Sequence, residues 1–131
     1  MPADPKPIYQ LIADVPKGAV ASYGMIASLL PGYTARMVGK ALSNLETGSK
    51  TPWHRIVQSA GTIAERLSAD VQRQKLAEEG VSFRKSGAVD WSSCRWRGPS
   101  QKWINKTGAD PEWVMEIVAT WPVRNVRPAR H

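Results

Sequence analysis

Two short amphipathic segments, separated by a proline and a glycine, constrain the fold of this chain more than any other feature of its sequence. Ser22 can cap a first helix whose apolar residues end at Leu30, and Pro31-Gly32 then stops that helix. Thr34 can cap a second helix, whose apolar residues recur at helical spacing as far as Leu45. Two short helices joined by a tight turn that contains glycine are typical of a helix-turn-helix, so the sequence predicts that motif here.

Further elements predicted on both sides of this motif indicate a mainly α domain with small β hairpins. Apolar residues at helical spacing predict a short helix over residues 8–15. Short apolar runs on either side of glycine-containing turns predict hairpins over residues 56–63 and 81–91, with a helix over residues 68–79 between them. The second hairpin has the position of a wing, so the predicted fold class is a winged helix-turn-helix domain.

The chain is strongly basic, which indicates an anionic partner. Eighteen lysines and arginines stand against eleven aspartates and glutamates, giving a formal net charge of +7. Such a charge attracts polyanions, because binding releases their counterions. Ribosome-associated and membrane-surface proteins can be equally basic, so charge alone does not identify nucleic acid as the partner.

The cysteine and histidine content argues against a metal site. Cys94 is the only cysteine, so neither an internal disulfide nor an all-cysteine zinc site can form. The two histidines, His54 and His131, lie far apart in the sequence, and we expect no metal and no cofactor. The sequence has neither a signal-peptide pattern nor an apolar run of bilayer-spanning length. A cytoplasmic location without membrane contact, at the nucleoid if the source is bacterial, is therefore expected by default.

Four short blocks follow one another in a recognisable order within a region from about residue 5 to 91. They are Ser22-Tyr23-Gly24, Ala35-Arg36-Met37-Val38-Gly39-Lys40-Ala41-Leu42, Pro52-Trp53-His54-Arg55-Ile56-Val57 and Ser59-Ala60-Gly61-Thr62-Ile63. Together they resemble the DNA-binding domain of the O6-alkylguanine-DNA alkyltransferases. In that family the third block normally begins Pro-Cys-His-Arg, and its cysteine accepts the alkyl group. A tryptophan in place of this cysteine is typical of the alkyltransferase-like subgroup, which binds alkylated guanine without repairing it.

The resemblance implies a binding protein and not an enzyme. A residue that accepts an alkyl group needs a soft atom that can lose a proton, and the indole of Trp53 offers none. Its flat apolar face can instead stack on a purine or line a pocket for one. An isolated tryptophan is more often a core residue, but Pro52 and His54-Arg55 beside it favour the pocket. The implied partner is double-stranded DNA that contains O6-alkylguanine, with nucleotide excision repair proteins as further partners, and we expect a monomer.

Two residues are implied to extrude the damaged base, which cannot reach a protein pocket while it is stacked in a duplex. By resemblance, Tyr23 crowds the 3′ phosphate and helps to rotate the nucleotide. Arg36 enters the stack and fills the vacancy. Without the resemblance, Tyr23 is only an aromatic residue at a helix start, and Arg36 only an exposed basic side chain.

The outer face of the second predicted helix carries the small residues Thr34, Ala35 and Gly39. Small residues allow a helix backbone to come close to DNA, and the family inserts this helix into the minor groove. Helices that read sequence in the major groove present long polar side chains instead, so sequence-specific recognition is disfavoured. The alternative is that Ala35 and Gly39 permit close packing against another helix.

Further pocket residues follow from the resemblance alone. Arg66 corresponds to an arginine that lies over the flipped base, Ser68 to a serine that hydrogen-bonds the base, and Ile56 lines the pocket through its backbone. Alternatively, Arg66 contacts only a phosphate and Ser68 only caps a helix. The predicted lesion-binding residues are Tyr23, Thr34, Ala35, Arg36, Gly39, Trp53, His54, Arg55, Ile56, Arg66 and Ser68, with no catalytic residue and no metal ligand.

One departure from the active family supports the loss of chemistry. In active members a carboxylate completes the relay of cysteine and histidine. The matching helix of this chain reads Val71-Gln72-Arg73-Gln74-Lys75. We therefore expect no carboxylate beside His54.

Residues 92–131 lie outside the resemblance and are predicted to form an extension with a short helix at about 110–120. Its tryptophans, interleaved with basic residues, could form a nucleic-acid surface, a docking patch or added core, and we favour added core. Cys94 as a relocated alkyl acceptor is disfavoured, because neither proline nor histidine flanks it. A residual alkyltransferase and a winged-helix transcriptional regulator are the alternatives to a damage-binding protein.

Overall fold

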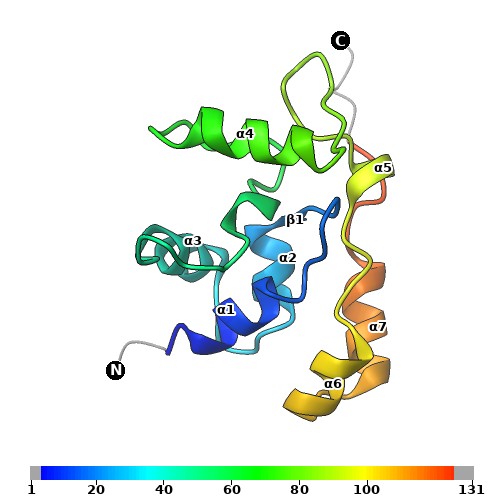
Figure 1. The fold of residues 1–131 in the computed structure, drawn as a ribbon. Coiled ribbons are helices and arrows are strands. Elements are labelled where there is room, and N and C mark those ends of the chain that lie inside the picture. The colour runs from blue at the N-terminus through cyan, green and yellow to red at the C-terminus, as the bar shows by residue number, and fades with distance from the viewer. Residues whose placement is uncertain (1–3, 126–131) are drawn as a thin grey trace.

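The computed structural model describes residues 4–125 and is mainly helical, as the sequence predicts. Its elements are α1 (Lys6–Ile12), β1 (Ala21–Ser22), α2 (Tyr23–Ser28), α3 (Ala35–Ser43), the 3₁₀ helix η1 (Trp53–Arg55), β2 (Ile56–Val57), α4 (Ala69–Glu78), α5 (Trp91–Cys94), α6 (Gln101–Thr107) and α7 (Pro111–Ala119) (Figure 1). Within the described part of the chain, no helix is long and apolar enough to cross a membrane.

The helix-turn-helix is formed by α2 and α3, and both predicted caps are present. The Ser22 hydroxyl accepts a hydrogen bond from the backbone amide of Met25 at 3.1 Å, which satisfies an otherwise free donor of the first turn of α2. The Thr34 hydroxyl does the same for Met37 at 3.2 Å. Gly32 has a φ of +87°, a conformation that permits the sharp turn between the helices. The two helices pack on each other, and both contact α1.

The sheet differs from the predicted first hairpin. β1 and β2 pair in parallel, with Ala21 opposite Ile56 and Ser22 opposite Val57. The turn that follows β2 is closed by two backbone hydrogen bonds, from the Gln58 amide to the Thr62 carbonyl at 2.9 Å and from the Gly61 amide to the Gln58 carbonyl at 2.8 Å. Ile56 and Val57 are buried, and their pairing partner lies 35 residues earlier in the chain (56 − 21), which a local pattern cannot show. The pairing joins the segment before Tyr23 to the segment after Trp53.

The second predicted hairpin is present in reduced form. Phe83 and Val89 make an antiparallel bridge, and the Arg84 amide donates to the Ala88 carbonyl at 2.8 Å. No longer strand forms in this part of the described chain.

The extension packs onto the rest of the chain, as the preferred interpretation of its tryptophans predicts. Trp96, Trp103 and Trp121 are buried in the common core. The rings of Trp96 and Trp121 are stacked at 5.6 Å, and the indole nitrogen of Trp121 donates to the Ser28 hydroxyl at 3.0 Å. Because they are buried, these three tryptophans do not form a nucleic-acid surface. The boundary at residue 91 stays a prediction, since buried residues on both sides of it belong to one core.

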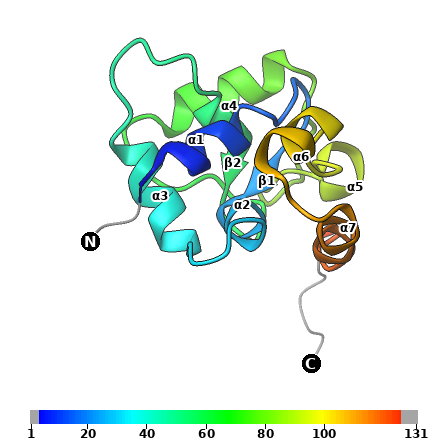
Figure 2. The ribbon, with the colours of Figure 1, turned by 90° about the horizontal axis from the view of Figure 1, so that it is seen from below.

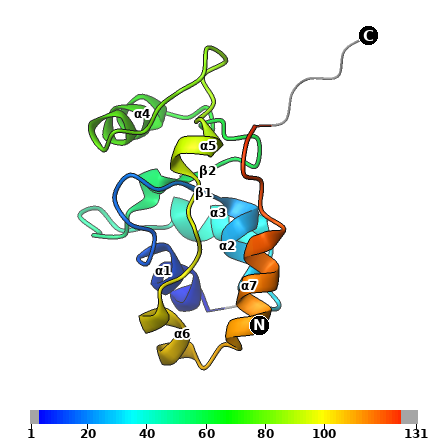
Figure 3. The ribbon, with the colours of Figure 1, turned by 90° about the vertical axis from the view of Figure 1, so that its right-hand side faces the viewer.

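The extension lies on the opposite side of α2 from α3. In two perpendicular views, α3 occupies one side of the molecule and α5, α6 and α7 the other (Figures 1 and 2). The chain runs from α5 to α6 and then returns through α7 (Figure 3). The outer face of α3 is thus left uncovered by the extension.

Candidate nucleic-acid interface

The turn that carries Trp53 is the centre of the predicted site. Trp53 is half-buried and packs against the core, while part of its ring stays accessible. The His54 ring meets it edge-on, with the two centroids 6.2 Å apart. The Arg66 guanidinium carbon lies 5.7 Å from the centroid of the Trp53 ring, within the range of a cation–π contact. The fold therefore brings Trp53 and Arg66 together, although 13 positions separate them (66 − 53).

A buried glutamine that the sequence analysis missed connects these residues. Gln72 has no exposed surface. Its side-chain amide donates to the carbonyl oxygens of His54 at 3.2 Å and Ile56 at 2.8 Å. Its oxygen accepts from the Arg66 guanidinium at 2.9 Å. No pattern identifies Gln72 beforehand, because it lies in a polar helix whose residues Val71 and Arg73 on either side are both exposed.

The expectation that no carboxylate lies beside His54 is wrong. Glu79, which directly follows α4, accepts a hydrogen bond from His54 Nε2 at 2.9 Å. The same carboxylate forms a two-pronged ion pair with Arg55, at 3.0 and 2.7 Å. The middle of α4 carries no carboxylate toward His54, but the helix packs against the Trp53 turn and its far end supplies Glu79. Trp53, and not a missing carboxylate, is therefore the feature that disfavours alkyl transfer.

Glu79 is held in its charged form. Burial by itself raises the pKa of this carboxyl group, but hydrogen bonds from Arg55, His54 and the Gly18 amide outweigh it and lower the pKa to about 2. Arg55 also donates to the Val15 carbonyl at 2.9 Å. His54 and Arg55 thus tie the Trp53 turn to two other parts of the fold, and their contact with DNA stays a prediction.

The outer face of α3 is open, as minor-groove insertion requires. Thr34, Ala35 and Arg36 are exposed. A methyl group built on Gly39 would meet no other atom within 4 Å. The alternative that Ala35 and Gly39 permit close packing against another helix is therefore disfavoured, because Ala35 is exposed and an added methyl group at Gly39 would meet no other element of the described chain.

This open face leads to opposite expected effects of Gly39→Ala on folding and on binding. Alanine is favoured over glycine inside a helix, so the free energy of unfolding should stay the same or rise by up to ~1 kcal/mol. If the backbone of α3 approaches DNA closely, the added methyl group should weaken duplex binding several-fold. Urea unfolding and a DNA titration of the same preparation measure both quantities. Unchanged affinity for DNA would show that α3 does not approach DNA at Gly39.

Three further predicted residues lie near the Trp53 turn in different settings. Tyr23 is half-buried and starts α2 directly after β1. The Ile56 side chain is buried, its carbonyl accepts from Gln72, and its backbone amide donates to the Trp53 carbonyl. Ser68 stands at the N-cap position of α4, but its side chain makes no capping hydrogen bond. The interpretation of Ser68 as a side-chain cap is therefore wrong, because its backbone has a near-helical ψ of 3°.

The predicted residues do not all line one cavity. A cavity of about 340 Å³ lies beside Trp53, His54 and Arg55 and is also lined by Lys50 and Lys75. Tyr23, Arg66 and Ser68 are not among its lining residues. The structure thus joins Trp53 to Arg66 by contact, while Tyr23 and Ser68 lie outside the cavity beside Trp53.

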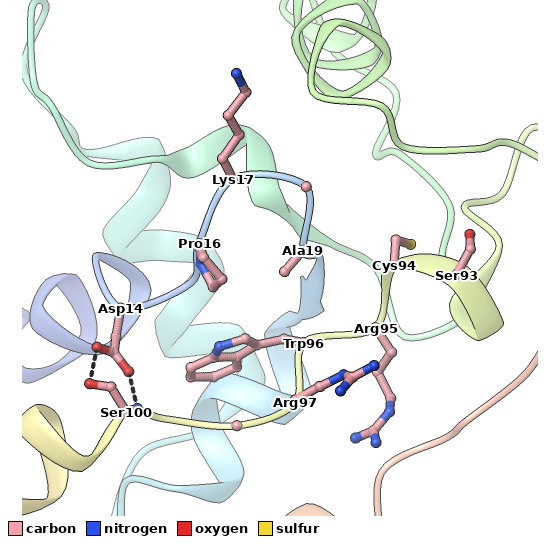
Figure 4. A pocket seen from close by; sticks show the side chains of 12 residues that line it. Asp14, Pro16, Lys17, Ala19, Ser93, Cys94, Arg95, Trp96, Arg97 and Ser100 are labelled. Carbon is pink, nitrogen blue, oxygen red and sulfur yellow. Dashed lines mark hydrogen bonds between the residues drawn. The ribbon is translucent and has the colours of Figure 1, made fainter.

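Cys94 lies in a different region and is poorly suited to accept an alkyl group. It lines a cavity of about 480 Å³ between the loop at Asp14 and the segment up to Ser100 (Figure 4). The side chain is buried, and its thiol donates to the Asp90 carbonyl at 3.1 Å. Burial, with the Asp90 carboxylate adding to it, raises the pKa of Cys94 to about 11. A residual alkyltransferase that uses Cys94 is disfavoured by both facts.

The buried thiol should be inert while the protein is folded. At pH 8 we expect Cys94 to react with a disulfide reagent such as DTNB at least ~100-fold more slowly than after unfolding in urea, because the thiolate is the reactive form. The Cys94→Ser variant should bind DNA as the unchanged protein does. Rapid labelling of the folded protein would show that the thiol is accessible and would reopen its candidacy as an acceptor.

Comparison with known protein families gives one match that spans more than half of the chain. The model of the family described as "6-O-methylguanine DNA methyltransferase, DNA binding domain" matches residues 5–81.

Individual proteins and solved structures agree with this match. The chain is 43% identical over 93 residues to a DNA base-flipping protein of Vibrio parahaemolyticus, covering 69% of this chain and 92% of that one. It is 46% identical over 89 residues to alkyltransferase-like protein 1 of Schizosaccharomyces pombe, covering 64% and 82%. The crystal structure of S. pombe Atl1 in complex with damaged DNA containing O6-carboxymethylguanine superposes with a TM-score of 0.55 at 38% identity, over 64% of this chain and 82% of that one.

Proposed function

Because this chain belongs to the family of the 6-O-methylguanine DNA methyltransferase DNA-binding domain, we propose that it binds O6-alkylguanine in double-stranded DNA and holds the base extruded without removing the alkyl group. The observation that carries the proposal is the pair of Trp53 and Arg66, with the guanidinium 5.7 Å from the ring centre. An aromatic face and a cation at one turn can recognise a purine, and neither group can accept an alkyl substituent.

The chemistry of the pair suits a purine whose O6 is alkylated. Stacking on Trp53 replaces the stacking that the base loses when it leaves the duplex, which is worth about 1–3 kcal/mol per base. The Arg66 guanidinium is attracted to the face of an electron-rich ring. Extrusion itself costs a few kcal/mol, and least for a base whose pairing is already weakened, which favours a damaged guanine over an intact one.

The open face of α3 supports docking in the minor groove. Ala35 and Gly39 allow close approach of the helix backbone, and the exposed Arg36 can fill the space that the extruded base leaves. Tyr23, at the start of α2, is placed in our proposal against the phosphate of the rotated nucleotide. A net charge of +7 supplies attraction to the DNA backbone that does not depend on sequence.

Binding without transfer is the proposed activity. Trp53 supplies no nucleophile, Cys94 is buried, and His54 Nε2 is hydrogen-bonded to Glu79. A protein that recognises a lesion without removing it has to pass the lesion to an enzyme that does. We therefore propose that the complex is a signal for excision of the damaged nucleotide, in line with the nucleotide excision repair partners that the resemblance implies.

A transfer assay combined with a base-extrusion assay tests this function. The DNA is a duplex whose single O6-methylguanine carries a radioactive methyl group and has 2-aminopurine as its neighbour. We expect all label to stay on the DNA, while 2-aminopurine fluorescence rises because its stacking partner has left. Label on the protein would establish an alkyltransferase and overturn the proposal, and unchanged fluorescence at saturating protein would overturn base extrusion.

A further inference from the structure

Gln72 is the most completely buried polar side chain near the candidate site. It is 0% exposed, although α4 is otherwise a polar surface helix in which only Leu76 is also buried. Burying an amide without hydrogen bonds costs free energy, so such a side chain is normally fully bonded. Gln72 meets this rule, since both of its donors and its acceptor have partners. Its position therefore depends on those three partners and in turn restrains them.

Two of the three partners belong to the turn that carries Trp53, and the third is Arg66. The carbonyl oxygens of His54 and Ile56 belong to the turn that holds Trp53, at 3.2 and 2.8 Å from the Gln72 amide nitrogen. The guanidinium of Arg66 donates to the Gln72 oxygen at 2.9 Å. One buried amide thus fixes the backbone that carries the aromatic face and the cation that lies over that face.

We propose that Gln72 is a positioning residue for lesion recognition, which holds Arg66 over the Trp53 turn before DNA arrives. This inference rests on the proposed function. An exposed arginine loses rotamer freedom when a ligand immobilises it, and prior restraint removes part of that loss from the binding step. A guanidinium already held at the turn therefore favours a purine that enters there.

The contact between Arg66 and the Trp53 ring cannot hold the guanidinium in place once a base enters between them. A base stacked between Trp53 and Arg66 needs two stacking distances, roughly 7 Å in total, which exceeds the present 5.7 Å. The guanidinium must therefore move outward or aside when the base enters. Its hydrogen bond to Gln72 does not involve the ring, so this bond can keep Arg66 beside the Trp53 turn during that movement.

A double-mutant cycle separates positioning from a merely structural role. The variants are Gln72→Met, which keeps the side-chain volume without its hydrogen bonds, Arg66→Ala and the double variant. The measured quantity is the lesion preference, the ratio of the Kd for a guanine duplex to the Kd for the same duplex with O6-methylguanine. We expect Gln72→Met to lower this ratio about 5-fold or more, and the double variant to equal Arg66→Ala alone. A further loss on adding Gln72→Met to Arg66→Ala would show that Gln72 acts on recognition through the Trp53 turn and not through Arg66, and would overturn the proposal.

Two companion variants keep the test decisive if Gln72→Met unfolds. Gln72→Glu retains an acceptor for Arg66 and loses the donors to the turn, so it should keep the lesion preference within about 2-fold while its stability falls. A preference lost to the same extent as the stability would contradict the positioning role. Gln74→Met, at an exposed position of the same helix, is the matched control and should change neither quantity.

A measurement without DNA distinguishes failure of this inference from failure of the proposed function. In ¹⁵N NMR spectra of the free protein, the Arg66 side chain should give a restrained guanidinium signal that becomes mobile in Gln72→Met and stays unchanged in Gln74→Met. An Arg66 signal that is equally mobile in the unchanged protein and in Gln72→Met would overturn the positioning role whatever the protein binds. A restrained signal together with no lesion preference in the unchanged protein would overturn the proposed function.

Discussion

Replacing Arg36 with alanine is expected to weaken binding to a duplex with one O6-methylguanine by about 10- to 100-fold, because the gap in the stack is then left unfilled at a cost of a few kcal/mol. The free energy of unfolding should change by less than ~0.5 kcal/mol, since Arg36 is exposed on α3. Titration of a fluorescent duplex and urea unfolding measure the two effects.

Lys40→Ala is the matched control for this variant. Lys40 is also exposed and lies one helical turn further along α3, so its removal subtracts the same charge. It should weaken binding to damaged and intact duplexes alike, as loss of a single phosphate contact does. Equal effects of the two substitutions on damaged and intact DNA would show that Arg36 acts only through its charge and does not enter the stack.

Replacing Glu79 with glutamine is expected to lower the free energy of unfolding at pH 7 by about 1–3 kcal/mol, because the charge-assisted hydrogen bonds of Arg55 and His54 lose their acceptor charge. The side chains of Glu79 and Arg55 are only 11% and 17% exposed, so water can replace the lost partner only in part. Lesion binding should weaken as well, because these bonds hold the turn that carries Trp53. Glu78→Gln, at an exposed neighbouring position, should be close to neutral.

The pH dependence of this effect has a definite sign. The pKa of Glu79 in the folded protein is about 2, below its ordinary value of 4.5, so its contribution to stability is fully present above about pH 4.5. It is lost as the pH falls from there toward 2. The difference between the unchanged protein and Glu79→Gln in urea unfolding should therefore be largest at pH 7 and smaller at pH 3.5. A difference that grows on acidification would contradict the assigned ion pair.

The parts of the fold that local chemistry controls could be predicted from the sequence. Ser22 and Thr34 are good helix caps wherever a helix follows, and both cap as predicted. Apolar residues at helical spacing likewise predict α2 and α3, since one face of a helix repeats every three to four residues. Trp53 was identified by its neighbours in the sequence, which the fold keeps together in one turn.

The parts that the sequence did not reveal depend on contacts between distant residues. Glu79 reaches His54 only because α4 runs back toward the Trp53 turn, and a search of the middle of that helix misses it. Gln72 looks like any polar residue on a surface helix until its burial is known. The pairing of β1 with β2 is equally non-local, so the sequence pattern alone predicts a local hairpin for Ile56-Val57.

The contact between His54 and Glu79 bears on the proposal that this chain binds the lesion without transferring the alkyl group. A histidine and a carboxylate remain beside the position of the acceptor, so most of the supporting structure for chemistry is present. In this chain those groups instead anchor the Trp53 turn through Arg55 and the Val15 carbonyl. A rigid turn is also what a binding surface for an extruded base needs.

The most direct test of lesion recognition is a titration of two duplexes that differ only in one base, guanine or O6-methylguanine. We expect a Kd at least ~10-fold lower for the duplex with the lesion, in any surrounding sequence, with the methyl group still on the guanine after binding. Equal affinity for the two duplexes, or a preference for one undamaged sequence over the lesion, would contradict lesion recognition.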